Sequence, residues 1–550
     1  MGANMEQRWR AARRSPAVVG TLLLGLAGAP GAQLFEVAKL TADDAGDQAR
    51  FGTSVALSGS TALIGTRSPL VGDVFGAPVF GPGAAYVFER QPDGTWFEAQ
   101  KLMASDTELP NEFGHSVSLS GDRALVGAYR DNAPALDSGA AYVFERQLDG
   151  VWIESQKLTA AGGEAFDYFG YAVSIAGDHA VVGAPFDDDL GPLTGSAYVF
   201  ERQPGGSWTQ VQKLIASNAS AGARFGHSAA VAGDRAVVGA LLGGAAYVFE
   251  RQPGGSWVEV AVLTAADAGA QDHLGGSVAV GLDRALVGAP GGDGVAVDAG
   301  AAYAFEPQQG GGWTQVAKLV AGDGEPGDDF GGAVALAGDR ALVGAPGYDT
   351  AAVNPGAAYV FERQPDGSWV EAQVLTAGDG SPSDHLGDAV AASGQRVLAG
   401  AYFDDELGPA AGSAYAWGPS LDSDVGALSL AAGGVQQLSL HAGPALAGTV
   451  HLVLGSLNGT APGIAVDAVV LPLNADAYLL FTLAHPNAPP LASSLGVLDA
   501  EGHGTAAVAL PPLSAPGLAG LTFHHAFLAF DPAAGAAVFA SAPAALTLTP

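Results

Sequence analysis

The sequence contains no cysteine among its 550 residues. This absence excludes disulfide bonds, thiol catalysis and cysteine-based zinc sites, and it says nothing about the redox compartment, because export does not require disulfides. Basic residues are also scarce, with 23 Lys and Arg against 56 Asp and Glu and a net charge of −33. A chain this acidic repels nucleic acid, so we expect no nucleic-acid partner.

Long apolar runs are missing too, apart from Ala17 to Ala29 near the N-terminus. Four arginines precede this run and the small residues Ala29-Pro30-Gly31-Ala32 end it, which is the pattern of a secretory signal peptide. The run is shorter than the roughly 20 residues that a membrane helix needs. We therefore assign residues 1–32 to a signal peptide, expect no transmembrane segment after its removal, and predict a secreted or cell-envelope location, periplasmic or extracellular.

Glycine is abundant by contrast, with 80 residues, and it marks an internal repeat. Each unit has an apolar strand, a Gly-Asp turn, a second strand ending in GA, a loop, a GAAYVFER-like strand, a tight turn and a fourth strand. Seven units of four short strands predict an all-β chain with a seven-bladed β-propeller over residues 33–418. The units are aligned on a Phe-Gly or Leu-Gly pair that begins at Phe51, Phe113, Phe169, Phe225, Leu274, Phe330 and Leu386.

The two ends of the repeat region complement each other. The seventh unit ends at Trp417 without a fourth strand, while an extra strand, Leu34 to Leu40, precedes the first unit. We expect this N-terminal strand to complete the last blade, because a closed ring leaves no exposed sheet edge. Six tryptophans begin fourth strands, and we interpret them as packing between blades rather than as a carbohydrate platform: Trp96, Trp152, Trp208, Trp257, Trp313 and Trp369.

The FG pairs, the GAP sequences that begin at Gly183, Gly288 and Gly344, and the sevenfold count resemble the FG-GAP repeats of integrin α chains and of many secreted bacterial proteins. The resemblance covers residues 33–418 and implies a propeller used for extracellular adhesion or ligand recognition. Integrin-type repeats often carry a DxDxDG calcium loop between FG and GAP, whereas this chain has a bare turn there, such as Gly121-Asp122. One carboxylate cannot supply the roughly six to eight oxygens that calcium prefers, so we do not transfer the family's calcium sites.

Only the loop between the second and third strands changes length. Its flanking glycines are 12 residues apart in five units, but 18 apart in the first (Gly65 to Gly83) and 5 apart in the fourth (Gly239 to Gly244). Because strands alternate in direction, this loop shares one propeller face, the loop face, with the acidic links between blades. The candidate ligand-binding residues are carboxylates of these loops: Asp131, Asp137, Asp187, Asp188, Asp189, Asp293, Asp298, Asp349, Asp404 and Asp405.

Three interpretations of these carboxylates stay open. They recognise an extracellular protein or glycan ligand, they hold a cation such as Ca²⁺ through residues that the pattern does not identify, or they only keep a secreted protein soluble. We expect a non-enzymatic binding or adhesion protein at the cell surface, with no certain cofactor. The alternatives are a glycan-active hydrolase, although nothing selects one carboxylate pair as catalytic, and a passive envelope component without a ligand.

Two further features concern the repeat itself. The face opposite the loop face is expected to be basic, because its turns carry Arg90, Arg146, Arg202, Arg251 and Arg363. The sequence Gly114 to Ser118 resembles a nucleophile elbow, but it lacks the final glycine and precedes a strand rather than a helix. The same FGHS recurs in the fourth unit, so we attribute it to the repeat.

The repeat ends near residue 418, and no Lys or Arg follows Arg396. Residues 419–550 contain apolar strands separated by Gly and Pro turns, which predicts a small sandwich-like β-domain. A short helix is expected from an Asn474 cap to His485. Six of the eleven histidines lie here, and we do not expect them to form a metal cluster. The predicted strands are Val435–Leu440, Thr449–Leu454, Gly504–Leu510, Leu521–Phe530 and Ala537–Ala540.

Overall fold

The computed structural model describes residues 34–550 apart from residues 68–69, 75–76, 92–93, 107–110, 133, 270, 350–352, 424–426, 444–445, 462, 467–468, 501, 513–517 and 532–535. The predicted signal peptide, residues 1–32, lies outside the described residues. Within the described part, no helix is long and apolar enough to cross a membrane.

Seven four-stranded antiparallel sheets confirm the predicted propeller blades. Blade 1 is β2 (Ser54–Ser58), β3 (Thr61–Thr66), β6 (Ala84–Arg90) and β7 (Trp96–Leu102). Blade 2 is β8 (Phe113–Ser120), β9 (Arg123–Ala128), β10 (Ala140–Arg146) and β11 (Trp152–Leu158). Blade 3 is β12 (Ala172–Ala176), β13 (His179–Ala184), β14 (Ser196–Arg202) and β15 (Trp208–Leu214). Blade 4 is β16 (Phe225–Ala232), β17 (Arg235–Ala240), β18 (Ala245–Arg251) and β19 (Trp257–Leu263).

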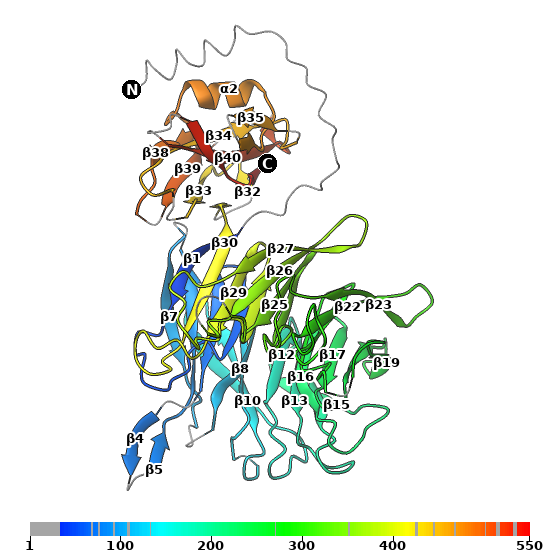
Figure 1. Ribbon diagram of the computed structural model, residues 1–550. Helices are drawn as coiled ribbons and strands as arrows, with labels where there is room; N and C mark the ends of the chain where they lie inside the picture. Colours follow the sequence, from blue (N-terminus) through cyan, green and yellow to red (C-terminus); the bar gives the residue numbers. More distant parts are fainter. Residues whose placement is uncertain are drawn as a thin grey trace. The chain divides into compact units, whose positions relative to one another are not determined.

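The remaining three blades complete the ring. Blade 5 is β20 (Ser277–Val280), β21 (Ala285–Ala289), β22 (Ala301–Pro307) and β23 (Trp313–Leu319). Blade 6 is β24 (Val334–Ala337), β25 (Arg340–Ala345), β26 (Ala357–Arg363) and β27 (Trp369–Leu375). Blade 7 is β28 (Ala389–Ser393), β29 (Arg396–Ala401), β30 (Ser413–Pro419) and the N-terminal β1 (Leu34–Leu40), which pairs antiparallel with β30 (Figure 1). The N-terminal strand therefore completes the last blade, as the sequence predicts.

The first strands of successive blades contact one another in a closed circle, from β2 through β8, β12, β16, β20 and β24 to β28 and back to β2. These strands consequently lie innermost and surround the propeller axis. Glycines allow the close approach of neighbouring blades. A Cβ on Gly127 of blade 2 would lie 2.0 Å from the carbonyl oxygen of Gly170 in blade 3, and one on Gly400 of blade 7 would lie 1.9 Å from that of Gly52 in blade 1.

Aromatic side chains fill each blade. In blade 2, Phe113 of the FG pair is fully buried, and its ring meets those of Tyr142 and Phe144 edge to face at centroid distances of 5.4 and 6.0 Å. Such pairs add to the free energy gained by burying large apolar surfaces. Trp152, 2% exposed, belongs to an apolar cluster that also contains Leu63 and Leu102 of blade 1. The predicted packing of the tryptophans between blades is confirmed there.

A glutamine in several outer strands joins one blade to the next. Gln156 of blade 2 accepts a hydrogen bond from the Trp208 backbone N–H at 2.7 Å and donates to its carbonyl at 2.8 Å. Gln100, Gln212 and Gln373 form the same pair of bonds to the next blade. The blade interface is thus held by backbone recognition at its outer edge as well as by apolar packing.

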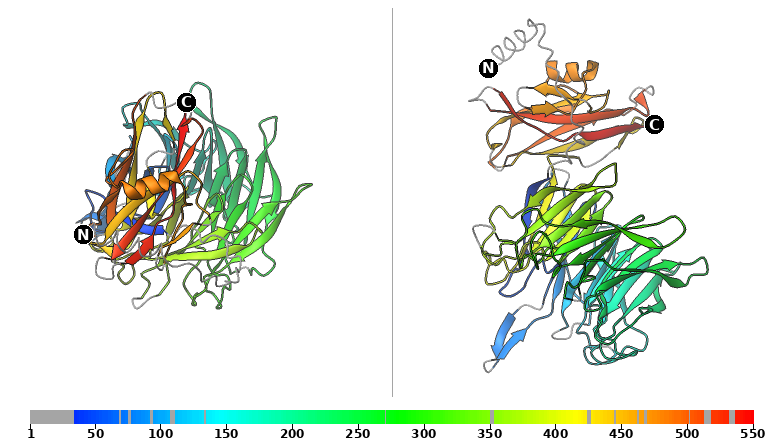
Figure 2. Two further views of the ribbon diagram at one scale, coloured as in Figure 1. Left: turned by 90° about the horizontal axis from the view of Figure 1, so that it is seen from above. Right: turned by 45° about the vertical axis from the view of Figure 1, so that its right-hand side comes forward.

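One loop carries its own structure. The long loop of blade 1 contains the hairpin β4 (Leu70–Val74) and β5 (Ala77–Phe80), which the repeat pattern did not predict and which extends away from the blade in Figures 1 and 2. The additional residues of this loop therefore form a β-hairpin.

Beyond the propeller, two sheets enclose a shared apolar core that includes Leu438, Val453, Val508 and Phe527. This confirms a sandwich-like module. Its first sheet contains β31 (Leu421–Ser423), β33 (Gly434–His441), β39 (His503–Leu510) and β37 (Leu491–Ala492). The second contains β32 (Ala427–Ser429), β42 (Ala544–Thr549), β40 (Thr522–Asp531), β34 (Val450–Ser456), β38 (Leu495–Val497) and β41 (Ala536–Ala540), and a separate hairpin joins β35 (Ile464–Val466) to β36 (Val469–Leu471).

The predicted helix of this module is shorter than expected. Helix α2 spans Ala477–Ala484, and its N-cap is Asp476, whose carboxylate accepts from the Leu479 backbone N–H at 2.7 Å. Asn474, the predicted cap, instead donates to the carbonyls of Asn458 and Ala461. Asp476 replaces Asn474 as the cap because a carboxylate caps a helix at least as well as an amide does. The amide of Asn474 is already bonded to the loop that precedes α2.

Candidate ligand-binding face

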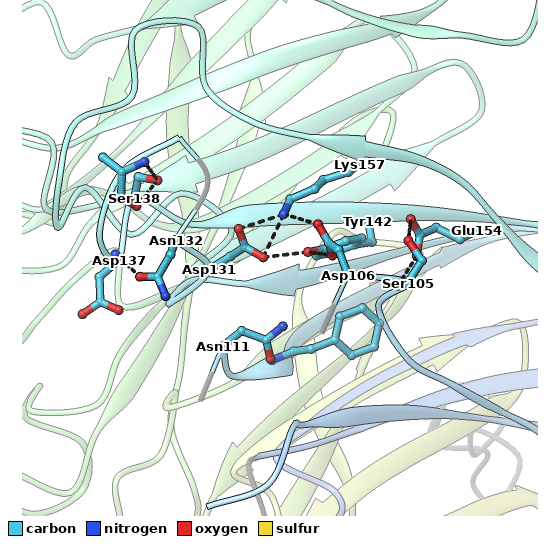
Figure 3. Close-up of polar contacts among 12 residues, drawn as sticks. Ser105, Asp106, Asn111, Asp131, Asn132, Asp137, Ser138, Tyr142, Glu154 and Lys157 are labelled. Atoms are coloured by element: carbon cyan, nitrogen blue, oxygen red, sulfur yellow. Dashed lines mark hydrogen bonds and ion pairs between the residues drawn. The ribbon is translucent and has the colours of Figure 1, made fainter. Parts of the chain in front are cut away.

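A buried carboxylate cluster ties the variable loop to its blade, as blade 2 illustrates (Figure 3). The Tyr142 hydroxyl lies 2.7 Å from a carboxylate oxygen of Asp131 and 2.7 Å from one of Asp106. Lys157 donates to Asp106 at 2.7 Å and to Asp131 at 2.9 Å. The tyrosine and lysine belong to the repeated third and fourth strands, so the framework itself supplies the donors. A link carboxylate and a loop carboxylate meet at them, which places both sets of acidic loops on one face.

Blade 3 repeats this cluster within its acidic loop. Asp187 accepts from Ser196 at 2.7 Å, from Tyr198 at 2.9 Å and from Lys213 at 2.6 Å. Burial alone would raise the pKa of Asp187, but the hydrogen bonds from Lys213 and Ser196 hold it below its usual value. Blade 7 shows the same arrangement with Asp404, Ser413, Tyr415 and Lys39.

Three of the ten predicted site residues are therefore internal. Asp131, Asp187 and Asp404 are only 2%, 3% and 5% exposed, and their carboxylates are hydrogen-bonded within the blade. Their geometry assigns them the role of fixing the loop. Any ligand recognition by the loops consequently depends on the carboxylates that follow them.

The other predicted residues reach solvent to different degrees. Asp137 is half-buried, and the exposed ones are Asp188, Asp189, Asp293, Asp298, Asp349 and Asp405. Asp189 pairs with Lys213 at 2.6 Å, and Asp293 and Asp349 accept backbone N–H groups of their own loops. Among the described residues, the side chains of Asp188 and Asp405 have no polar partner. These two carboxylates stand free beside a buried, anchored neighbour.

The links between blades contain a second set of buried carboxylates. Asp167 is 4% exposed and accepts from the Glu164 backbone N–H at 2.7 Å, and Asp384 is 3% exposed and accepts from that of Ser381. Burial raises the pKa of each to about 6, nearby aspartates add to the rise, and the backbone hydrogen bond opposes it. Asp328 occupies the same position in blade 6, with its pKa also raised by burial.

The expectation of a basic opposite face is wrong, because most of its arginines are neutralised by the preceding blade. Arg202 donates to Glu145 at 3.0 Å, and Arg251 donates to Glu201 at 2.7 Å. Arg146 and Arg363 pair likewise with Glu89 and Glu306, and Arg90 with Asp422. Three of the glutamates that precede an arginine in FER, Glu89, Glu145 and Glu201, thus pair with the arginine of the next blade. Glu250 and Glu362 instead pair with Arg235 and Arg340 of their own blades.

A group of aromatic and basic side chains gathers where the innermost strands begin on the loop face. It was missed because its members flank the FG pairs and the GA sequences one residue at a time, in different blades. The sequence does hold one indication of this group: the residues beside the FG and GA pairs differ from unit to unit, whereas the pairs themselves are repeated. We call this group the axial cluster: Arg67, His115, Tyr129, Arg130, Tyr168, Tyr171, Phe186, Arg224 and His227, with Arg50 at its edge beside Phe403.

Contacts within the axial cluster are continuous. Arg67 Nη2 donates to Nδ1 of His115 at 3.1 Å, and the His115 ring lies 4.8 Å from that of Tyr171. Tyr171 in turn lies 5.1 Å from His227. Burial lowers the pKa of His115 to about 3, helped by Arg67, and that of His227 to about 4. Both imidazoles are therefore neutral at physiological pH.

The residue before each FG pair has a left-handed backbone. All seven are non-glycine residues with φ between 52° and 58°: Arg50, Glu112, Tyr168, Arg224, His273, Asp329 and His385. This conformation costs a bulky residue on the order of 1 kcal/mol or more, and glycine would relieve it. The conformation recurs in all seven blades, so it belongs to the turn that precedes each innermost strand.

No group of three or more His, Cys, Asp or Glu side chains that could hold a metal ion occurs among the residues that the structure describes. Calcium binding thus has no assigned ligands here.

Similarity to individual known proteins is weak. No curated protein matches the sequence significantly. Among solved structures, a virginiamycin B lyase from Staphylococcus aureus is 8% identical, with a TM-score of 0.42. The match covers 70% of this chain and 99% of the lyase chain. The periplasmic gluconolactonase of Pseudomonas aeruginosa is 17% identical, with a TM-score of 0.41. That match covers 60% of this chain and 86% of the gluconolactonase chain. A Lactobacillus plantarum protein is 13% identical, again with a TM-score of 0.41, covering 70% and 92%.

The family model for the FG-GAP repeat matches seven times, at residues 34–88, 96–144, 152–200, 208–249, 257–305, 313–361 and 369–417. Each match begins at the fourth strand of one blade and ends in the third strand of the next, and the seven together cover more than half of the chain. With seven four-stranded blades that meet at the FG and GA glycines, the chain belongs to the FG-GAP repeat family.

Proposed function

We propose that this protein is an exported, non-enzymatic binding protein that recognises a protein or glycan ligand through the loop face of its propeller. One observation carries the proposal. In blades 3 and 7 the first loop carboxylate is anchored to Tyr, Ser and Lys side chains of the blade, while the next, Asp188 or Asp405, is exposed and unpartnered. Charge presented by short loops on a rigid frame is how binding faces are commonly built.

The difference between scaffold and loop supports this proposal. Loop length changes only on the loop face, whereas the opposite turns repeat almost unchanged and their arginines are paired. A passive solubilising surface needs charge on both faces but does not need a loop of variable length on one of them. The signal-like N-terminus supports a secreted or cell-envelope location, where such ligands occur.

The experiment is a capture assay with matched charge variants. Residues 33–550 are immobilised, incubated with envelope and polysaccharide extracts with and without a divalent-cation chelator, and the retained material is identified by mass spectrometry. The Asp188→Asn, Asp189→Asn, Asp405→Asn triple variant tests the loop face. The control, Asp122→Asn, Asp178→Asn, Asp234→Asn, removes the same charge from the opposite turns.

A ligand retained by the wild type and the control but lost by the loop-face variant is the expected result. Equal loss in both variants would mean non-specific charge attraction, and retention by all three would contradict a role for these carboxylates. Loss on chelation would add a cation to the contact. Turnover of the retained material that single carboxylate substitutions abolish would identify a hydrolase instead.

A further inference from the structure

Unpaired arginines are rare in this chain and share one location. Residues 34–550 contain 19 Lys and Arg. Fifteen of these have a carboxylate oxygen within 4.0 Å. Within the described part of the chain, only Arg50, Arg67, Arg130 and Arg224 have none, and all four lie in the axial cluster or at its edge. Among the described residues of this strongly acidic chain, the cations without a carboxylate partner are thus gathered at one place.

Aromatic rings support these arginines in place of carboxylates. The guanidinium of Arg224 lies 4.9 Å from the Phe186 ring centre, and that of Arg50 lies 5.4 Å from the Phe403 ring centre. Stacking uses the face of the guanidinium and leaves the N–H groups of its edge for an anion. The Nε atoms of Arg67, Arg130 and Arg224 are buried with no hydrogen-bond partner in the described structure. Arg146 and Arg363 on the opposite face also have a buried Nε of this kind, but unlike the axial arginines they have a carboxylate partner.

The surroundings suit a sugar ring. Tyr129, Tyr168 and Tyr171 are half-buried, and their phenol rings offer apolar faces with a hydroxyl at one end. Nδ1 of the neutral His115 accepts from Arg67, which leaves its Nε2–H as a donor, and Nδ1 of the neutral His227 donates to the Gly276 carbonyl, which leaves its Nε2 as an acceptor. One free donor and one free acceptor suit the hydroxyl groups of a saccharide. On the blade 7 side lies the carboxyl group of Asp388, which adds a further acceptor; burial raises its pKa to about 6, and Arg67 opposes the rise.

We propose that the axial cluster binds the carboxylate of a terminal uronic acid, with the arginines on the carboxylate and the aromatic faces against the sugar ring. This inference rests on the proposed function, because it places the recognised group on the same loop face. The acidic loops around the axis repel a long polyanion, so a single acidic sugar at a chain end is favoured over a polyuronate.

The test is calorimetric titration of residues 33–550 with glucuronic acid, with glucose and inorganic sulfate as comparison ligands. Glucuronate is expected to bind at least about tenfold more tightly than either, because it alone offers both the carboxylate and the ring. Arg67→Gln and Arg224→Gln should each weaken glucuronate about tenfold or more, and Arg224→Lys should retain part of the affinity. Arg123→Gln, which removes an arginine from the opposite face, should change nothing.

Equal binding of glucuronate and glucose would overturn the role of the arginines, and sulfate binding as tight as glucuronate would overturn the role of the rings. No heat with glucuronate at millimolar concentration would overturn both, and these comparisons use the wild type, so they do not depend on the variants folding. If the capture assay retains a ligand that the loop-face variant releases while glucuronate fails to bind, the proposed function stands and this inference falls.

Discussion

At the scale of single residues, the acidic loops contain two kinds of carboxylate: buried ones that bond to the blade and fix the loop, and exposed ones that face solvent. Asp187 and Asp188 are adjacent in the chain, yet one accepts three hydrogen bonds inside the blade and the other faces solvent. The sequence could not distinguish them, because the choice depends on the tyrosine of β14 and the lysine of β15, which lie 11 and 26 residues further on. The tyrosine bonds to Asp187 and the lysine to Asp187 and Asp189, while Asp188 between them bonds to neither.

Asp167 provides the first prediction. Its folded pKa of about 6 exceeds the ordinary value of 3.8, so its ionisation favours the unfolded chain. This cost is absent below about pH 4, grows as the pH rises toward 6 and is complete above about 7. Asp167→Asn removes the charge, and its amide oxygen can accept from the Glu164 N–H in place of the carboxylate oxygen. It should raise the free energy of unfolding by on the order of 1 kcal/mol at pH 7.5 and leave it unchanged at pH 4.

Urea denaturation at the two pH values measures this difference, with Asp298→Asn, an exposed aspartate in the loop of blade 5, as the control that should show neither effect. A stabilisation of the same size at both pH values would show that the charge of Asp167 is not the cause.

At the scale of elements, the fourth strands connect neighbouring blades through Gln100, Gln156, Gln212 and Gln373. In blade 4, Ala261 occupies the position of Gln156: Ala261 pairs with Val248 just as Gln156 pairs with Val143. The chain therefore contains blade interfaces with and without this connection, on the same backbone.

Removing or adding the glutamine should consequently have opposite effects. Gln156→Ala should lower the free energy of unfolding by about 1–2 kcal/mol, because it deletes two hydrogen bonds to the Trp208 backbone. Ala261→Gln should raise it by up to about 1 kcal/mol by bonding to the Trp313 backbone. Chemical denaturation of the two variants and the wild type tests both, and a loss of stability in Ala261→Gln would contradict the equivalence of the two interfaces.

The elements also show what the sequence could predict. The strands of all blades follow from the repeated FG, GA and AAYVFER sequences, because each is a local solution to packing within a blade. The axial cluster was not predictable in this way, since Arg67, His115 and Arg224 come from different blades and meet only after the ring closes. The pairing of Arg202 with Glu145 was missed for the same reason. The hairpin β4–β5 was missed because its loop has no counterpart in the other units.

At the scale of the whole molecule, closure of the ring depends on a contact between its first and last blades. A Cβ on Gly400 would lie 1.9 Å from the Gly52 carbonyl oxygen, in backbone that cannot move without opening the ring. Gly400→Ala should therefore lower the free energy of unfolding by about 3 kcal/mol or more. Gly254→Ala, where no atom lies within 4 Å of the added carbon, should have little effect. Equal melting temperatures of the two variants would contradict closure through this contact.

The central claim is that ligand recognition belongs to the loop face. The most direct measurement is hydrogen–deuterium exchange of residues 33–550 with and without the material that the capture assay retains, followed by peptide mass spectrometry. Protection is expected in the loops between second and third strands, in the links between blades, and around the FG pairs at Phe113, Phe169 and Phe225. Protection confined to the opposite turns, such as residues 203–207 and 252–256, would contradict the account.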